Sequence, residues 1–332
     1  MRIAPVQFRT LLEGAAELVP RGNLFWVRRL PVDTESLIVD DELLAVADMA
    51  AGVRFVFSTD AHAIRLVAYT SMPAEFTNPV APFDVVVNGE LFVRQTITGD
   101  GRLHVDGLGT GVKRVEIWLP HFGVAELGEL TLLGATTVVP ASPERPHWIA
   151  YGSSITQCKE SDGPSEAWPS IVAAEYDWRL TNLGFGGQCH LDPVVARHVR
   201  DTRADLITLC LGINVWGRSS LPARTLAPAI VGFIETIRDG HPTTPIVVTT
   251  PIASPGREDK PNEDGLTLSE IRVIVHETVV RLQQRGDERL HLVNGLDVMG
   301  MAEAPLLEDG LHPGPEGYRY LARSMSAQLI TL

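Results

Sequence analysis

Three short peptides in this chain carry the residue types that acyl transfer requires. They are Gly-Ser-Ser-Ile-Thr at 152–156, Gly-Ile-Asn at 212–214 and Asp-Gly-Leu-His at 309–312. Brought together, they would offer a hydroxyl nucleophile, an amide donor, a general base and a carboxylate that orients the base. The chemistry that these groups would perform is the attack of a serine on an ester carbonyl.

A serine hydroxyl is a weak nucleophile at neutral pH and needs a base within hydrogen-bonding reach. An imidazole ionises close enough to neutrality to take the hydroxyl proton and return it later, so His312 is the candidate base. Asp309, three residues earlier, can accept a hydrogen bond from the other ring nitrogen, which fixes the tautomer and stabilises the imidazolium. On these grounds both Ser153 and Ser154 fit the position of the nucleophile.

The first part of the chain has the pattern of an antiparallel β domain. Apolar residues alternate with period two over much of 53–133, which is typical of strands with one buried face. Asn88 and Gly89 separate two apolar runs and tolerate the positive φ angles of a type I′ turn, so they predict a hairpin. We therefore expect residues 1–140 to form an all-β, jelly-roll-like sandwich that serves as an accessory substrate-binding domain.

Three prolines within residues 140–146 oppose both helix formation and strand pairing, so this segment is predicted to be a linker. Beyond it, short apolar runs alternate with helical patterns, and the clearest helical pattern covers 268–282. Such alternation predicts a flavodoxin-like, three-layer α/β/α domain with a five-stranded parallel sheet over residues 147–332. The expected buried strands lie at 148–151, 180–183, 206–211, 246–250 and 290–293.

The candidate peptides occupy equivalent places in this predicted sheet. Residues 152–156 follow the first strand, the glycine-rich turn at 184–187 follows the second, and residues 212–214 follow the third. Residues 309–312 precede the last helix. Because ligands bind beyond the carboxyl ends of parallel strands, these four loops are expected to meet at one edge of the sheet.

At these residues the second half of the chain resembles the SGNH, or GDSL, hydrolase family, whose members carry a serine, a glycine, an asparagine and a D-x-x-H motif in this order. The resemblance implies that Ser154 is the nucleophile and that Asp309 and His312 complete the triad. It also implies an oxyanion hole formed by the N–H of Ser154, by Gly187 and by Asn214. No cofactor and no metal is expected.

Two positions depart from the family pattern. Ser153 replaces an aspartate, and Val215 replaces the aspartate that commonly follows the asparagine. Neither position carries a proton in the mechanism, so the departures bear on substrate preference. The sandwich ahead of the catalytic half resembles the two-domain type of GDSL acyltransferase that installs a salicylate ester on a polyketide.

The bulk composition excludes several classes of partner. The net charge of −13 and the absence of a basic run argue against nucleic acid. No apolar run approaches the ~18 to 20 residues of a membrane span, and the first twenty residues lack a secretory leader, so we expect a cytoplasmic protein without a membrane partner. The three cysteines, Cys158, Cys189 and Cys210, lack C-x-x-C spacing and are expected to be structural thiols.

We expect an esterase that acts on oxygen esters of small molecules through an acyl-enzyme. The alternative is an acyltransferase, in which an alcohol of a natural product or sugar replaces water; both reactions use the same catalytic residues. A third hypothesis is an inactive carbohydrate-binding protein, which the intact Ser154, Asp309 and His312 disfavour. The sequence leaves open the acyl group, the alcohol and the oligomeric state.

Overall fold

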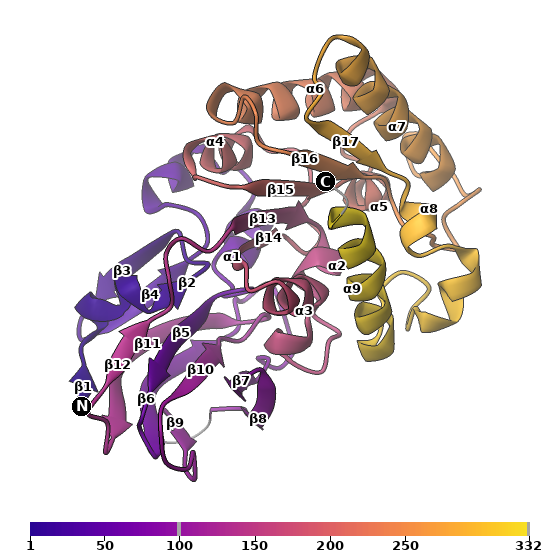
Figure 1. The fold of residues 1–332 in the computed structure, drawn as a ribbon. Helices are drawn as coiled ribbons and strands as arrows, with labels where there is room; N and C mark the ends of the chain where they lie inside the picture. The colour runs from indigo at the N-terminus through magenta and orange to yellow at the C-terminus, as the bar shows by residue number, and fades with distance from the viewer. Residues whose placement is uncertain (98–100, 331–332) are drawn as a thin grey trace. The chain divides into compact units, whose positions relative to one another are not determined.

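The structure of the chain, a computed structural model, describes residues 1–97 and 101–330. It divides into two compact units (Figure 1). One consists of residues 1–145, 162–166 and 179–182, and the other of 146–161, 167–178 and the residues from 183 onward.

Within its described residues, the first unit contains two antiparallel sheets, as the period-two pattern predicts. One sheet has the order β3-β4-β11-β6-β9, with β1 paired to β11, and the other has the order β12-β5-β10-β7-β8, with β2 paired to β5. The predicted β-sandwich is therefore confirmed. The elements are β1 (Arg2–Ile3), β2 (Leu12–Glu13), β3 (Glu17–Arg21), β4 (Leu24–Arg28), α1 (Asp41–Ala47), β5 (Arg54–Thr59), β6 (Ala63–Ser71), β7 (Phe83–Val87), β8 (Glu90–Gln95), β9 (Arg102–Val105), β10 (Lys113–Trp118), β11 (Val124–Leu133) and β12 (Val138–Pro140), with 3-10 turns at Pro5–Thr10 and Val32–Leu37.

Alternate side chains of these strands build the core of the unit. In β9 the burial alternates strictly, and Phe55 and Phe57 of β5 are almost completely buried. β7 and β8 form the predicted hairpin, in which Asn88 and Gly89 have φ angles of 51° and 88°. Local turn chemistry therefore places this pair of strands in register.

The linker begins one residue later than the sequence predicts. Pro140 ends β12 and is paired with Phe57 of β5, whereas the sequence placed it in the irregular segment. β12 is the edge strand of its sheet, where a residue that lacks an N–H group is tolerated.

The described residues from His147 onward form a parallel sheet of five strands, as predicted. The order is β14-β13-β15-β16-β17, which is the 2-1-3-4-5 order of flavodoxin-like folds. The sheet order reverses next to β13, and a crevice for ligands forms at such a point. The strands are β13 (His147–Gly152), β14 (Arg179–Gly184), β15 (Leu206–Cys210), β16 (Ile246–Thr249) and β17 (Leu290–Val293).

Helices cover both faces of this sheet. α4 and α7 pack against α6 on one face, and α3 packs against α9 on the other (Figure 1). The three-layer prediction is therefore confirmed. The helices are α2 (Ser154–Gln157), α3 (Trp168–Glu175), α4 (Pro193–Asp201), α5 (Ile213–Arg218), α6 (Ala223–Gly240), α7 (Leu268–Gln284), α8 (Gly295–Val298) and α9 (Pro315–Leu329), with 3-10 turns at Pro164–Glu166 and Met301–Leu306.

α7 shows why the sequence signal for this half was strong. Its predicted apolar stripe is buried, and a capping box of Thr267 and Glu270 begins the helix, because each side chain accepts the backbone N–H of the other residue.

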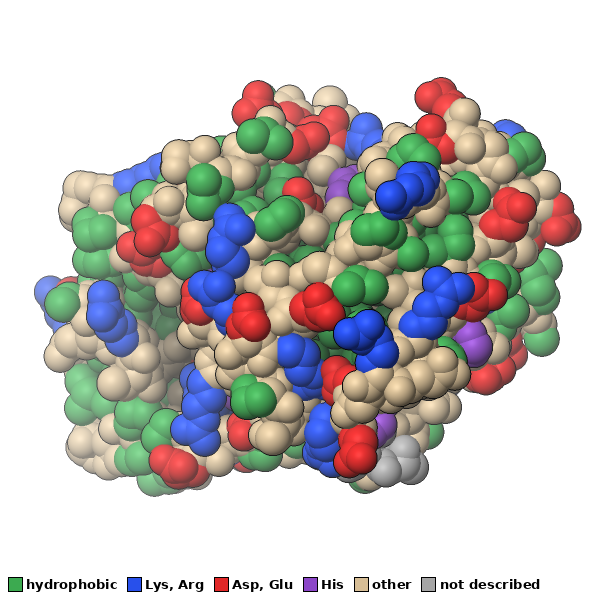
Figure 2. Space-filling view, turned by 90° about the horizontal axis from the view of Figure 1, so that it is seen from above, with side chains coloured by type: hydrophobic (Ala, Val, Ile, Leu, Met, Phe, Trp, Pro, Cys, Tyr) green, Lys and Arg blue, Asp and Glu red, His purple; other side chains and the backbone are tan. Residues whose placement is uncertain are grey.

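On the face drawn in Figure 2, acidic and basic side chains are interspersed. In the parts of the chain that the structure describes, no helix has the length and apolar character needed to cross a bilayer.

Candidate active site

Ser154 begins a one-turn helix at the carboxyl end of the first strand in the second unit. β13 ends at Gly152, and α2 follows after Ser153. Ser153 caps this helix, since its Oγ accepts the N–H of Ile155 at 3.2 Å. A carboxylate performs the same N-cap role, so a serine can occupy the place of the aspartate in the SGNH pattern without disturbing the helix start. The buried Ser153 thus faces the helix backbone, whereas Ser154 is partly exposed.

Ser154, His312 and Asp309 are in contact, although the serine and the histidine lie 158 positions apart in the sequence. Ser154 Oγ lies 2.9 Å from His312 Nε2, and His312 Nδ1 lies 2.7 Å from Asp309 Oδ2. Asp309 Oδ1 also accepts the backbone N–H groups of Leu311 and His312. The arrangement allows the imidazole to take the serine proton while the carboxylate holds the ring.

The charge of Asp309 is secured by its neighbours. Burial raises the pKa of this carboxyl, but the hydrogen bonds from the backbone and imidazole of His312 outweigh burial and lower the pKa to about 2. Asp309 is therefore ionised at neutral pH, as the orienting group of a base must be.

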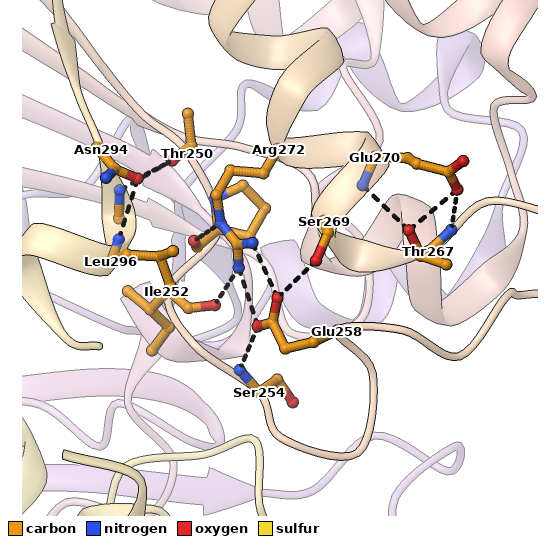
Figure 3. A network of polar contacts seen from close by, with 12 residues as sticks. Thr250, Ile252, Ser254, Glu258, Thr267, Ser269, Glu270, Arg272, Asn294 and Leu296 are labelled. Carbon is orange, nitrogen blue, oxygen red and sulfur yellow. Dashed lines mark hydrogen bonds and ion pairs between the residues drawn. The ribbon is translucent and has the colours of Figure 1, made fainter. Parts of the chain in front are cut away.

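A buried ion pair supports the loop that carries Asp309. The hydroxyl of Ser254 donates to the carbonyl of Gly310 at 2.7 Å, and the backbone N–H of Ser254 donates to Glu258 at 3.0 Å. Glu258 in turn accepts two hydrogen bonds from the guanidinium of Arg272 on α7 (Figure 3). A continuous chain of polar contacts therefore connects α7 with the residue next to Asp309.

Gly187 lies in the turn after β14 and has a φ of 74°, in the left-handed region that favours glycine. Its carbonyl lies 3.0 Å from His190 Nε2, and Ser220 Oγ lies 2.8 Å from Nδ1 of the same ring. Because a carbonyl only accepts, Nε2 carries the hydrogen of this contact. Within residues 1–97 and 101–330, the N–H groups of Gly187 and Ser154 donate to no protein acceptor, so both are available to an oxygen ligand.

Asn214 lies in the first turn of α5, after β15. Its Oδ1 accepts the backbone N–H of Cys189 at 3.0 Å, so its Nδ2 group is the end available to a ligand. The following Val215 is 1% exposed and packs in the core, where a carboxylate would be costly without a partner. Ser154, Gly187 and Asn214 thus follow three neighbouring strands of the sheet.

Two supporting contacts were not predicted from the sequence. They are the contact of His190 with Gly187 and the ion pair of Arg272 with Glu258. In the sequence the candidate partner of His190 was Asp192, as a metal pair, and Asp192-Pro193 was better explained as the start of a helix. Arg272 resembled an ordinary helix-surface residue. Among the described residues, no group of three or more His, Cys, Asp or Glu side chains is arranged to hold a metal ion.

The three cysteines are free thiols that burial keeps protonated. Burial raises the pKa of Cys158 and Cys189 far above the usual thiol value, and it raises the pKa of Cys210 to about 11.

Trp168 is buried at the start of α3, and its Nε1–H donates to the carbonyl of Ile155. It lines a cavity of about 30 Å³, which is too small for an aromatic acyl group.

Two family models match this chain. The model of the GDSL-like lipase/acylhydrolase family matches residues 150–320, slightly more than half of the chain. The model of the SsfX3 N-terminal domain matches residues 13–127. No curated protein matches the chain.

Several solved structures share the architecture. The salicylyl-acyltransferase SsfX3 from a tetracycline biosynthetic pathway is 29% identical, with a TM-score of 0.91 over 100% of this chain and 97% of that one. A protein described as a GDSL-like lipase from Bacteroides ovatus is 20% identical, with a TM-score of 0.77 over 100% and 97%. A family two carbohydrate esterase from Cellvibrio japonicus is 16% identical, with a TM-score of 0.67 over 100% and 97%. The last two likenesses concern the fold alone.

Proposed function

The chain belongs to the GDSL-like lipase/acylhydrolase family, and on this premise we propose that it forms an acyl-enzyme on Ser154 from an ester of a small molecule. An enzyme of this family is an esterase or an acyltransferase, and the contacts among Ser154, His312 and Asp309 support either reaction. The observation that carries the proposal is the continuous contact of Ser154 with His312 and of His312 with Asp309.

In the first half of the proposed reaction, Ser154 Oγ bonds to the ester carbonyl carbon as its proton passes to His312 Nε2. The carbon–oxygen bond to the alcohol then breaks, and the same proton passes to the departing alcohol oxygen. Asp309 stabilises the imidazolium between these steps. In the second half, the oxygen of water or of an acceptor alcohol bonds to the acyl carbon as its proton passes to His312 Nε2. The bond from the acyl carbon to Ser154 Oγ then breaks, and His312 returns the proton to Ser154 Oγ.

Three donors are assigned to the negative charge that develops on the carbonyl oxygen. They are the N–H groups of Ser154 and Gly187 and the side-chain amide of Asn214. His190 holds the carbonyl of Gly187, which lies on the other side of the α-carbon from the donating N–H, and Cys189 holds the oxygen of Asn214, so these donors need little reorganisation during the reaction.

Hydrolysis is the first candidate, and transfer to an alcohol is the second. The observation that favours transfer is the similarity to the salicylyl-acyltransferase SsfX3, which extends over the whole of this chain. The match to the SsfX3 N-terminal domain supports a division into an accessory substrate-binding domain at 1–140 and a catalytic domain at 147–332.

The proposal is tested with 4-nitrophenyl acetate, with and without acceptor alcohols, and with a fluorophosphonate probe. We expect turnover and a covalent adduct on Ser154, and a loss of kcat of at least about 10³-fold in Ser154→Ala. The matched variant Ser153→Ala should keep the adduct and lose about 1 kcal/mol of stability, because it removes only a helix cap. Ester cleavage that survives in Ser154→Ala but disappears in Ser153→Ala would overturn the assignment. A new ester formed faster than free acid would favour transfer over hydrolysis.

A further inference from the structure

An open pocket of about 480 Å³ lies in the second unit, near the end of α5. One wall is the end of α5 together with the residues that follow it, and the other wall is the loop at 260–263. This volume lies within the range of small-molecule sites. Because α5 also carries Asn214, the pocket and the proposed reaction centre share an element. The lining residues are Trp216, Gly217, Arg218, Ser219, Lys260, Pro261, Asn262 and Glu263.

Hydrogen bonds join the two walls of this pocket. The indole Nε1–H of Trp216 donates to the carbonyl of Lys260 at 3.0 Å, and Asn262 Nδ2 donates to the carbonyl of Trp216 at 3.3 Å. The backbone N–H of Glu263 donates to Ser219 Oγ at 3.1 Å. The pocket is therefore formed by a cross-linked pair of segments, which reduces the loss of entropy when a ligand binds.

Arg218 connects the pocket with the proposed reaction centre. Its Nη2 atom lies 3.6 Å from the position that a Cβ would take on Gly187. Gly187 is assigned to the oxyanion hole, so a substrate whose carbonyl oxygen occupies that hole would have its adjoining part close to this guanidinium. A side chain on Gly187 would fill the space between the backbone of Gly187 and the guanidinium of Arg218.

The charges that line the pocket run against the charge of the whole chain. The chain carries a net charge of −13, yet Arg218 and Lys260 line this pocket, with Glu263 as the acidic member. The guanidinium of Arg257 lies 5.3 Å from the ring centroid of Trp216, which adds a further cation to this region. Guanidinium and ammonium groups are the side chains that recognise carboxylate and phosphate.

We infer that this pocket binds a negatively charged group on the substrate, so that the enzyme selects anionic esters over neutral esters of the same size. This inference rests on the proposed function, because it assigns a substrate class to the same site. Among the residues that line the pocket, Arg218 is the one whose side chain reaches Gly187, and it is expected to contribute most. The carboxylate of Glu263 repels the negatively charged group of the substrate and so weakens its binding.

Two pairs of esters test the inference, one for each side of the ester bond. In the first pair, mono-4-nitrophenyl glutarate carries a carboxylate on the acyl side, and 4-nitrophenyl butyrate lacks it. In the second pair, 4-acetoxybenzoate carries a carboxylate on the alcohol side, and methyl 4-acetoxybenzoate is neutral there. The measured quantity is kcat/KM for the anionic ester divided by kcat/KM for the neutral one. Comparing this ratio between variants cancels the intrinsic reactivity of the esters.

Arg218→Gln should lower the ratio about tenfold in the pair whose carboxylate reaches the pocket, as expected for the loss of a hydrogen bond to a charged group. Glu263→Gln should raise the same ratio about twofold, because it removes a repulsive charge. The control is Arg224→Gln, an exposed arginine at the start of α6, which changes the net charge by the same amount and should leave both ratios unchanged. Added salt should reduce the preference of the wild type.

The inference is overturned if Arg218→Gln lowers neither ratio by more than Arg224→Gln does. That result differs from a failure of the proposed function, in which the wild type would not cleave the neutral esters through Ser154 at all. A shift in the glutarate pair alone places the anionic group on the acyl side, and a shift in the acetoxybenzoate pair alone places it on the alcohol side. Either shift supports the inference.

Discussion

Replacing Arg272 by methionine should strongly destabilise the second unit, because this residue is half of a largely buried ion pair. The side chains of Arg272 and Glu258 are only 10% and 15% exposed. The guanidinium donates to both carboxylate oxygens, at 2.9 and 3.0 Å, and to the carbonyls of Pro251 and Ile252. Removing one partner of such a pair leaves an unpaired charge and costs about 3–5 kcal/mol. For a unit of this size, the thermal midpoint should fall by roughly 10 °C.

The same helix provides a matched control. Arg281 pairs with Glu277 at 2.9 Å, but these side chains are 67% and 55% exposed, so Arg281→Met should cost no more than about 0.5 kcal/mol. Urea unfolding followed by tryptophan fluorescence at pH 7.5 measures both losses. The double variant Arg272→Met/Glu258→Met should regain part of the stability, since no buried charge is left unpaired. A loss in Arg272→Met no larger than that in Arg281→Met would refute the reasoning.

The pH dependence of this loss provides a second check. Burial raises the pKa of Glu258, but the hydrogen bonds from Arg272 and Ser254 outweigh burial and lower the pKa below its usual 4.5. A lowered carboxyl pKa means that the contribution of the pair is present above pH 4.5 and is lost as the pH falls further. The stability difference between the wild type and Arg272→Met should therefore narrow below this pH. A difference that stays constant from pH 7 to pH 3.5 would contradict an ionic origin.

Three further predictions concern the proposed reaction centre. Asn214→Ala should lower kcat for 4-nitrophenyl acetate about 10²- to 10³-fold with a smaller change in KM. A loss of kcat below tenfold would show that the Asn214 amide does not belong to the oxyanion hole. Asp309→Asn should lower kcat by at least about 10²-fold. Because the pKa of Asp309 is about 2, protonation of this carboxyl should add no step to the pH dependence of wild-type activity above pH 4. Ser254→Ala removes the hydrogen bond to Gly310 and should lower kcat about tenfold through displacement of the Asp309 loop. Its effect should be much smaller in an Asp309→Asn background, and full additivity of the two variants would show that Ser254 acts elsewhere.

Much of the fold could be predicted because its signals are local. The hairpin at Asn88 and Gly89 depends on two residues that tolerate positive φ, and α7 depends on an apolar stripe that begins after a capping box. The start of the linker was predicted one residue too early, at Pro140, because only the completed sheet shows that no neighbour needs the missing N–H. The parallel arrangement of the five-stranded sheet followed from the alternation of strands and helices.

The candidate site could be predicted in part. The sequence named Ser154, Gly187, Asn214, Asp309 and His312 through the order of its motifs, and the structure brings the serine, the histidine and the aspartate into contact. The choice between the two serines came from resemblance alone. In the structure Ser153 caps α2, and this local hydrogen bond leaves the neighbouring Ser154 to face His312.

The sequence by itself determined the strands, the helices and the succession of motif residues, since these depend on periodicity and on neighbours within a few positions. Only the tertiary structure decided that Arg272 is a buried ion-pair partner, that His190 holds the carbonyl of Gly187, and that Arg218 and Lys260 line one pocket. The physical reason is that burial and side-chain contact are properties of segments far apart in the chain. An arginine in a helical pattern has the same local signal whether its guanidinium reaches solvent or a carboxylate from a distant loop.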